Sequence, residues 1–148
     1  MAQASREFEL DTDHFQILLG DGEQGPLVDT STLWNTAGGV AALSDDPYVV
    51  GIGTVRQGGR TRVRVDLKED TGGVIEEGKY LGDFLLSLPS GRLMVWSPET
   101  EDLANAPNVS MEPGRYRGRA FGLGLDEVRD ESALEGPEQY RIILSRVP

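Results

Sequence analysis

Cysteine is absent from the 148-residue chain, and histidine occurs once, at His14. The lack of cysteine excludes disulfides, a thiol nucleophile and a zinc site built on thiolates. A serine–histidine–carboxylate triad would have to use His14, and no Gly-x-Ser-x-Gly elbow is present. His14 follows Asp13, but neighbouring residues of a strand point to opposite faces. We therefore interpret His14 as a strand-edge residue with no catalytic role.

Long apolar runs are also missing. No stretch could cross a membrane, and the first ten residues lack the apolar core of a signal peptide. We expect a cytoplasmic protein without a membrane segment. An apolar content of 38% over 148 residues is enough for a buried core, so we predict one domain over 1–148 that needs no cofactor.

Basic residues are scarce. The 14 lysines and arginines face 25 acidic residues, which gives a formal net charge of −11. Phosphate binding needs concentrated positive charge, so nucleic acid is disfavoured as a direct ligand. Acidity favours solubility, and it also attracts a basic protein partner over long range.

Alternation of apolar and polar residues, with a period of two, runs through the chain in place of a helical period. It predicts strands over 6–10, 14–19, 27–29, 40–43, 48–56, 60–67 and 140–147, with a helical turn near Glu127. Between 82 and 122, an apolar run, a Pro-Gly turn and a second run occur twice, and we interpret each unit as a hairpin. Gln57-Gly58-Gly59 is expected to close a third hairpin. The long connections after Asp66 and Pro98 are expected to cross between sheets.

These elements together predict an all-β fold: an antiparallel β-sandwich of about eight to ten short strands in two sheets. The strand at 60–67 has the cleanest alternation, which indicates one buried and one wet face. Its wet face carries the first of two arginine rows, which are Arg60, Arg62 and Arg64, and Arg115, Arg117 and Arg119. Neighbouring rows would suit a carboxylate or phosphate ligand. The favoured interpretation is a solvated face whose arginines pair with acids such as Asp66.

Acidic loops carry an alternative function. Oxygen ligands for calcium could gather from Asp11, Asp13, Asp21, Glu23, Asp45 and Asp46 at one end of a sandwich, although EF-hand spacing is absent. A calcium- or carbohydrate-binding sandwich is therefore the alternative. A small hydrolase that uses paired carboxylates is a third hypothesis, with no marked nucleophile to support it.

Several segments resemble the competence protein J family of bacterial DNA-entry nuclease inhibitors. They are Phe8-Glu-Leu with His14-Phe15-Gln16-Ile17, the Trp34 and Gly38 region before an alanine-rich strand, the run from 48 to 67, and Leu-Pro-Ser-Gly-Arg-Leu at 88–93. The resemblance implies a small β-rich protein that binds and blocks a nuclease without catalysis. Acidity suits such an inhibitor, because carboxylates can occupy the place of substrate phosphates.

The predicted function is thus a non-catalytic protein-binding module, an inhibitor or immunity-type partner of a basic protein such as a nuclease. Its contact surface is expected in the acidic loops. The predicted contact residues are Glu99, Glu101, Asp102, Asp126, Glu127, Asp130 and Glu131.

Overall fold

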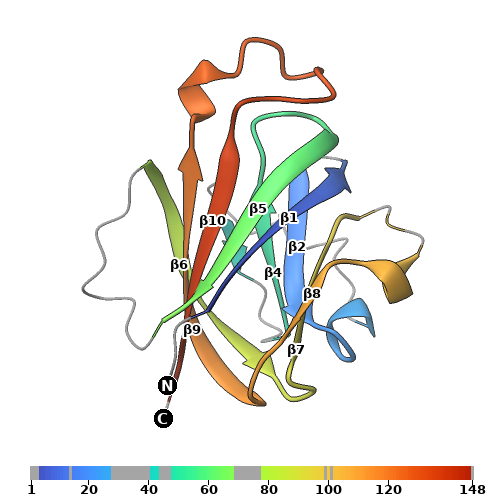
Figure 1. Cartoon of the computed structure of the whole chain (residues 1–148), viewed down its shortest axis with the longest axis vertical. Coiled ribbons are helices and arrows are strands. Elements are labelled where there is room, and N and C mark those ends of the chain that lie inside the picture. The colour runs from blue at the N-terminus through green and yellow to red at the C-terminus, as the bar shows by residue number, and fades with distance from the viewer. Residues whose placement is uncertain are drawn as a thin grey trace.

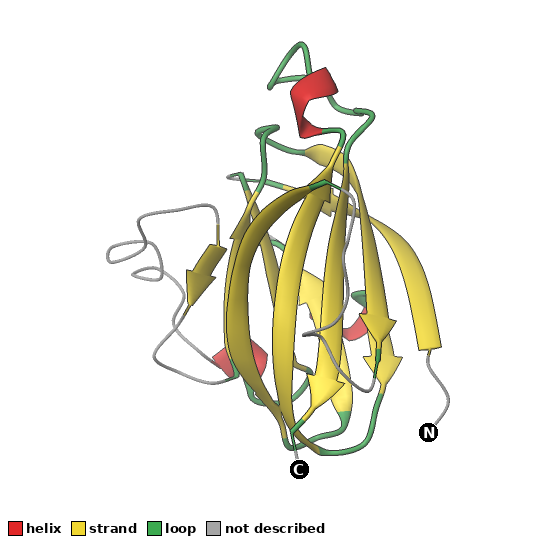
Figure 2. Cartoon of the chain, turned by 90° about the vertical axis from the view of Figure 1, so that its left-hand side faces the viewer, coloured by secondary structure: helices red, strands yellow, loops and turns green. Residues whose placement is uncertain are grey.

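The computed structural model describes residues 4–13, 15–27, 41–43, 48–68, 78–98, 100 and 102–147. These residues form ten strands and three short 3-10 helices, and the strands make two five-stranded sheets (Figures 1 and 2). The predicted all-β sandwich is therefore confirmed. Within the described ranges, no helix is long and apolar enough to cross a membrane.

The first sheet has the order β1-β5-β10-β9-β6. Its strands are β1 (Ala4–Thr12), β5 (Gly59–Leu67), β10 (Gln139–Arg146), β9 (Gly114–Leu123) and β6 (Lys79–Leu88). Neighbours are antiparallel except β5 and β10, which run parallel. The prediction of a wholly antiparallel sandwich was wrong at this pair. Parallel pairing needs a long connection, and the chain between β5 and β10 is long enough to supply it.

The second sheet has the order β3-β4-β2-β7-β8, with every pair antiparallel. Its strands are β3 (Ala41–Leu43), β4 (Val49–Gly53), β2 (Gln16–Asp21), β7 (Arg92–Trp96) and β8 (Asn108–Ser110). The 3-10 helices are η1 (Gly25–Leu27), η2 (Leu103–Asn105) and η3 (Leu125–Glu127). η3 confirms the helical turn expected near Glu127, whereas Leu27 ends η1 and does not begin a strand.

All three predicted hairpins were wrong, because each of these turns joins strands of different sheets. β4 leads into β5, β6 into β7, and β8 into β9, and each step changes sheet. β6 pairs with β9 while β7 pairs with β8, so the four strands form a two-stranded ribbon that bends from one sheet to the other. At one bend the Gly91 N–H donates to the Leu88 carbonyl over 3.1 Å, with Gly91 at a φ of 70°. Glycine has no Cβ to oppose that left-handed conformation.

The long connections were also assigned wrongly. The chain after Asp66 leaves β5 and returns to the same sheet as β6, and the chain after Pro98 joins neighbouring strands β7 and β8. In these five connections, the tight turns change sheets and the long segments stay within one.

The core lies between the sheets and is built from the inward positions of each strand. On β5, Val63 and Val65 are buried while Arg60 and Arg62 are exposed, which confirms the predicted buried and wet faces. Asp66 is an exception on the wet face, with only 3% of its surface exposed. β10 contributes Tyr140, Ile142 and Leu144 to the same core, so that the parallel pair forms its centre.

Candidate protein-binding site

The two arginine rows lie on the same face of the first sheet, but β10 separates them. The Asp66 carboxylate accepts hydrogen bonds from Arg64 Nε at 2.9 Å and from Arg141 Nη2 at 3.1 Å. Arg119 Nε donates to Asp83 at 2.8 Å. Burial raises the pKa of Asp66, but hydrogen bonds from Ser5 and the two arginines lower the pKa below its usual value. These pairs make this face the arginine–carboxylate surface that the sequence favoured.

Asp21 has a structural role and is not available to a cation. Its carboxylate accepts hydrogen bonds from the N–H and the hydroxyl of Ser90 at 3.0 and 2.7 Å, and from the N–H groups of Glu23 and Gln24 at 3.1 and 2.8 Å. Burial raises the pKa of Asp21, and these donors more than reverse that effect. The residue thus connects the end of β2 to the turn between β6 and β7.

The predicted calcium ligands do not gather at one end of the sandwich. Asp13 forms a β-bridge with Gln16 at the start of β2, and Asp21 ends that strand. Five residue steps of about 3.3 Å therefore place the two aspartates roughly 17 Å apart. No single ion can contact both, and the calcium site that combined these loops was wrong. Asp45 and Asp46 lie outside the described residues, and the described side chains include no group of three His, Asp or Glu that could hold a metal. The carbohydrate-binding alternative stays a prediction.

A groove with a volume of about 460 Å³ lies between β1 and described residues of the stretch that follows β7, namely Ser97, Thr100, Asp102 and 105–107. Its floor is apolar and nearly closed, because the lining residues Leu10, Val95 and Ala106 are 8%, 0% and 7% exposed. Among the residues that the structure describes, Glu9, Asp11, Asp13 and Asp102 line it with their carboxylates. The described residues that line the groove include no lysine or arginine. We call it the acidic groove.

Ser97 attaches one wall of the acidic groove to the other. Its hydroxyl oxygen lies 3.1 Å from the Asp11 carbonyl oxygen and 3.2 Å from Asp13 Oδ2, so its one proton serves both acceptors. The Ser97 N–H donates to Thr100 Oγ1 at 3.0 Å. On the same wall, Asn105 Nδ2 donates to Asp102 Oδ2 at 2.6 Å and orients that carboxylate. The groove is therefore a formed feature of the free protein.

A second acidic region is the segment 124–138, which we call the acidic loop. It projects from the top of the molecule in Figure 1. Its exposed acids are Asp126, Glu127, Asp130, Glu131 and Glu135. The Ser132 hydroxyl and N–H donate to Asp130 Oδ1 at 2.7 and 3.0 Å, and these bonds hold the pKa of Asp130 below its usual value. Leu134, 74% exposed, adds an apolar side chain to this charged surface.

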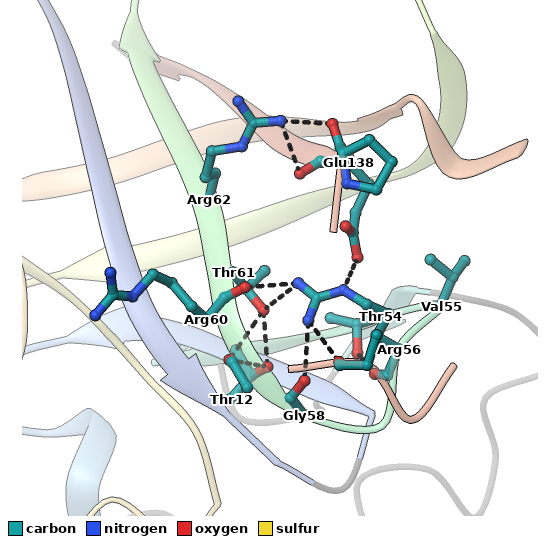
Figure 3. A network of polar contacts seen from close by, with 12 residues as sticks. Thr12, Thr54, Val55, Arg56, Gly58, Arg60, Thr61, Arg62 and Glu138 are labelled. Atoms are coloured by element: carbon teal, nitrogen blue, oxygen red, sulfur yellow. Dashed lines mark hydrogen bonds and ion pairs between the residues drawn. The ribbon is translucent and has the colours of Figure 1, made fainter. Parts of the chain in front are cut away.

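Arg56 fixes the acidic loop to the sandwich (Figure 3). Its Nε donates to Glu138 Oε2 at 2.7 Å, and the two side chains are 2% and 0% exposed. The other guanidinium nitrogens donate to the carbonyls of Gly58 at 3.0 Å, Ala133 at 3.1 Å and Arg60 at 2.6 Å, and to Thr61 Oγ1 at 3.4 Å. A buried charge is stable only when it is paired and hydrogen-bonded, and this network meets that condition for the arginine.

Backbone hydrogen bonds continue the attachment of the acidic loop. The N–H groups of Gln57 and Arg60 donate to the carbonyls of Glu131 and Leu134, at 2.6 and 2.7 Å. Gly136 packs so closely that an added Cβ would lie 2.2 Å from Glu138 Oε1. Nearby, the Tyr140 hydroxyl accepts from the Val55 N–H at 2.9 Å, and burial raises the pKa of Tyr140 to about 12. The acids of the loop are therefore presented on a preformed backbone.

The structure separates the predicted contact residues into two places. Asp102 lies on the acidic groove, together with Asp11 and Asp13 that the sequence had suggested for calcium. The acidic loop holds Asp126, Glu127, Asp130 and Glu131. Outside the described residues lie His14, Trp34, Glu99 and Glu101. Reasoning from sequence missed the groove floor and the Arg56–Glu138 pair.

Comparison with known proteins identifies solved structures with a similar fold. No protein-family model matches the chain, and no curated protein matches its sequence. Among solved structures, the chain superposes on "Crystal structure of ComJ, inhibitor of the DNA degrading activity of NucA, from Bacillus subtilis", with a TM-score of 0.66 over 99% of this chain and 100% of that one. The chain has a ComJ-like fold. Sequence identity to ComJ is 10%.

A protein titled "Crocagin biosynthetic gene J" is similar to the same extent, with a TM-score of 0.66, 21% identity and 99% of both chains covered. At these identities the likeness concerns the fold. It confirms the fold that the resemblance to the competence protein J family implied. The ComJ-like scaffold of this chain thus carries two carboxylate-rich surfaces, and ionised carboxylates on a rigid frame are suited to contact the cationic side chains of a protein.

Proposed function

We propose that the chain is a non-catalytic inhibitor that binds a basic nuclease through its acidic surfaces. The observation that carries this proposal is the ComJ-like fold over the full length of the chain, because the solved ComJ is titled an inhibitor of the DNA-degrading activity of NucA. The net charge of −11 supports a basic partner, since opposite charges accelerate encounter.

The acidic loop supports the proposal through its geometry. A nuclease binds the phosphates of its substrate with cationic side chains, and clustered carboxylates on another protein can occupy the same positions. Arg56 holds the loop backbone in place before any partner arrives. Less conformational entropy is then lost on binding, which favours tight association.

The experiment is capture of partners on the immobilised chain from lysate of the source cells at low salt, followed by elution with a salt step. We expect a basic protein that degrades DNA, whose activity falls when the chain is added back. Elution without DNA-degrading activity, or an activity unaffected by the chain, would contradict the proposal.

Charge-reversal variants then test the surface. Glu127→Lys with Glu131→Lys changes the acidic loop, and Glu23→Lys with Glu112→Lys makes the same change in net charge on exposed residues outside the loop and groove. The loop variant should slow association and flatten its dependence on salt, while the control variant changes both much less. Equal effects of the two variants would mean that net charge alone governs association and that the acidic loop is not a specific contact surface.

A second candidate is a binding role in a biosynthetic pathway, favoured by the equal structural similarity to the crocagin biosynthetic protein. The same capture experiment separates the two. A biosynthetic enzyme in the eluate, in place of a nuclease, would support this second function.

A further inference from the structure

β1 is an edge strand of the first sheet, and in the described part of the chain it pairs with β5 alone. Its Asp11 carbonyl points away from β5, toward Ser97. In an antiparallel pair, alternate residues direct both backbone groups to the same side. Glu9 and Glu7 therefore also direct their N–H and C=O groups away from β5. A strand edge with such groups is a template for another strand.

The acidic groove lies directly beside this edge. Glu9, Leu10 and Asp11 of β1 line it, and the small apolar surface of its floor comes from Leu10 and from Ala106, which are 8% and 7% exposed. The Glu9 side chain is 56% exposed and lies 3.7 Å from Arg60, so its charge remains accessible. The groove thus offers backbone donors and acceptors, an apolar floor and negative charge in one place.

We propose that the acidic groove binds an extended basic segment of the partner protein, which adds as a strand to the free edge of β1. This inference rests on the proposed function for the identity of the partner. Side chains of an added strand would alternate between two directions. One set would face the groove floor at Leu10 and Ala106, and the other would lie beside the carboxylates of Glu7 and Glu9. The segment that fits has small apolar residues alternating with arginine or lysine.

The test uses a synthetic probe, the capped hexapeptide Arg-Val-Arg-Val-Arg-Val, titrated into the ¹⁵N-labelled full chain and followed by NMR. We expect amide shifts at β1 and in the segment 95–107. Two control peptides are matched in length. The Glu-Val repeat has the opposite charge, and Arg-Val-Arg-Pro-Arg-Val keeps the charge but lacks one backbone donor. Both should bind at least about tenfold more weakly than the probe.

Two variants at Glu9 distinguish the contribution of its side-chain charge from that of its backbone N–H. Glu9→Gln removes the charge and keeps the N–H, and Glu9→Pro also removes the N–H that faces away from β5. Proline is tolerated on an edge strand where its nitrogen faces outward, and circular dichroism checks that the variant is folded. Glu9→Gln should weaken the probe about threefold, and Glu9→Pro about tenfold or more. Glu23→Gln, at an exposed residue outside the groove, makes the same change in net charge as Glu9→Gln and serves as the control.

Binding at β1 with loss in Glu9→Pro supports the inference. It is overturned if the probe does not bind at millimolar concentration, if the shifts lie on the acidic loop, or if Glu9→Pro and Glu9→Gln bind equally. Because no nuclease enters this assay, its outcome is separate from that of the capture experiment. If the probe binds the groove but no nuclease is captured, strand addition in the groove is supported and the nuclease-inhibitor function is contradicted.

Discussion

Substitution of Arg56 by methionine should loosen the acidic loop and destabilise the whole fold. Methionine keeps much of the side-chain volume but removes five hydrogen bonds and the positive charge beside Glu138. Glu138 Oε1 is buried without a hydrogen-bond partner among the described residues, so the carboxylate has little other support. Breaking a buried ion pair from one side lowers the free energy of unfolding by about 3–5 kcal/mol. A domain of this size has about 5–15 kcal/mol in total.

Urea unfolding at pH 7 measures this loss, and amide hydrogen exchange locates it. The N–H groups of Gln57 and Arg60, which donate to the acidic loop, should exchange faster in Arg56→Met. The double variant Arg56→Met with Glu138→Gln removes both charges and should recover about 2 kcal/mol relative to the sum of the single variants. A loss below about 1 kcal/mol in Arg56→Met, or additive single and double variants, would refute the reasoning.

Three further predictions concern the scaffold. Asp21→Ala leaves four donors without their acceptor and should lower the free energy of unfolding by about 2–4 kcal/mol in urea, with Glu23→Ala as the exposed control. Gly118→Ala should destabilise by about 1–3 kcal/mol, because the added Cβ would lie 2.2 Å from the Phe84 ring, and an unchanged melting temperature would contradict that packing. The pKa values of Asp21 and Asp66 lie below their ordinary value in the folded state, so their contribution is complete above about pH 5 and is lost as the pH falls through the folded pKa. Thermal unfolding between pH 7 and pH 2 should therefore show a falling melting temperature, and a smaller fall in Asp66→Asn than in the wild type.

The sequence predicted the positions of turns well but not the partners of strands. Pro89 and Gly91 do mark a tight turn, yet the strands on either side lie in different sheets. Alternation tells which face of a strand is buried. It is the same whether the strands on either side of a turn pair in one sheet or continue into two different sheets. Which strand lies beside which depends on contacts between distant residues, such as the parallel pairing of β5 with β10.

The Arg56–Glu138 pair left a signal in the sequence that could have been used. Arg56 has the same parity as the inward-facing residues Val50, Ile52 and Thr54. Glu138 lies two residues before Tyr140, the first inward-facing residue of β10. A charge on an inward row needs an opposite charge nearby. Alternation therefore predicts that both are buried, although only the fold shows that they meet. The acidic groove had no comparable signal, because its walls come from β1 and from a segment 86 residues further on.

The most direct measurement for the central claim is a titration of DNA degradation by the captured basic protein with increasing amounts of the chain, at low and at high salt. The account predicts that degradation stops at one chain per nuclease at low salt and returns as salt screens the carboxylates. Degradation that continues at excess chain, or DNA cleavage by the chain alone, would contradict a non-catalytic inhibitor.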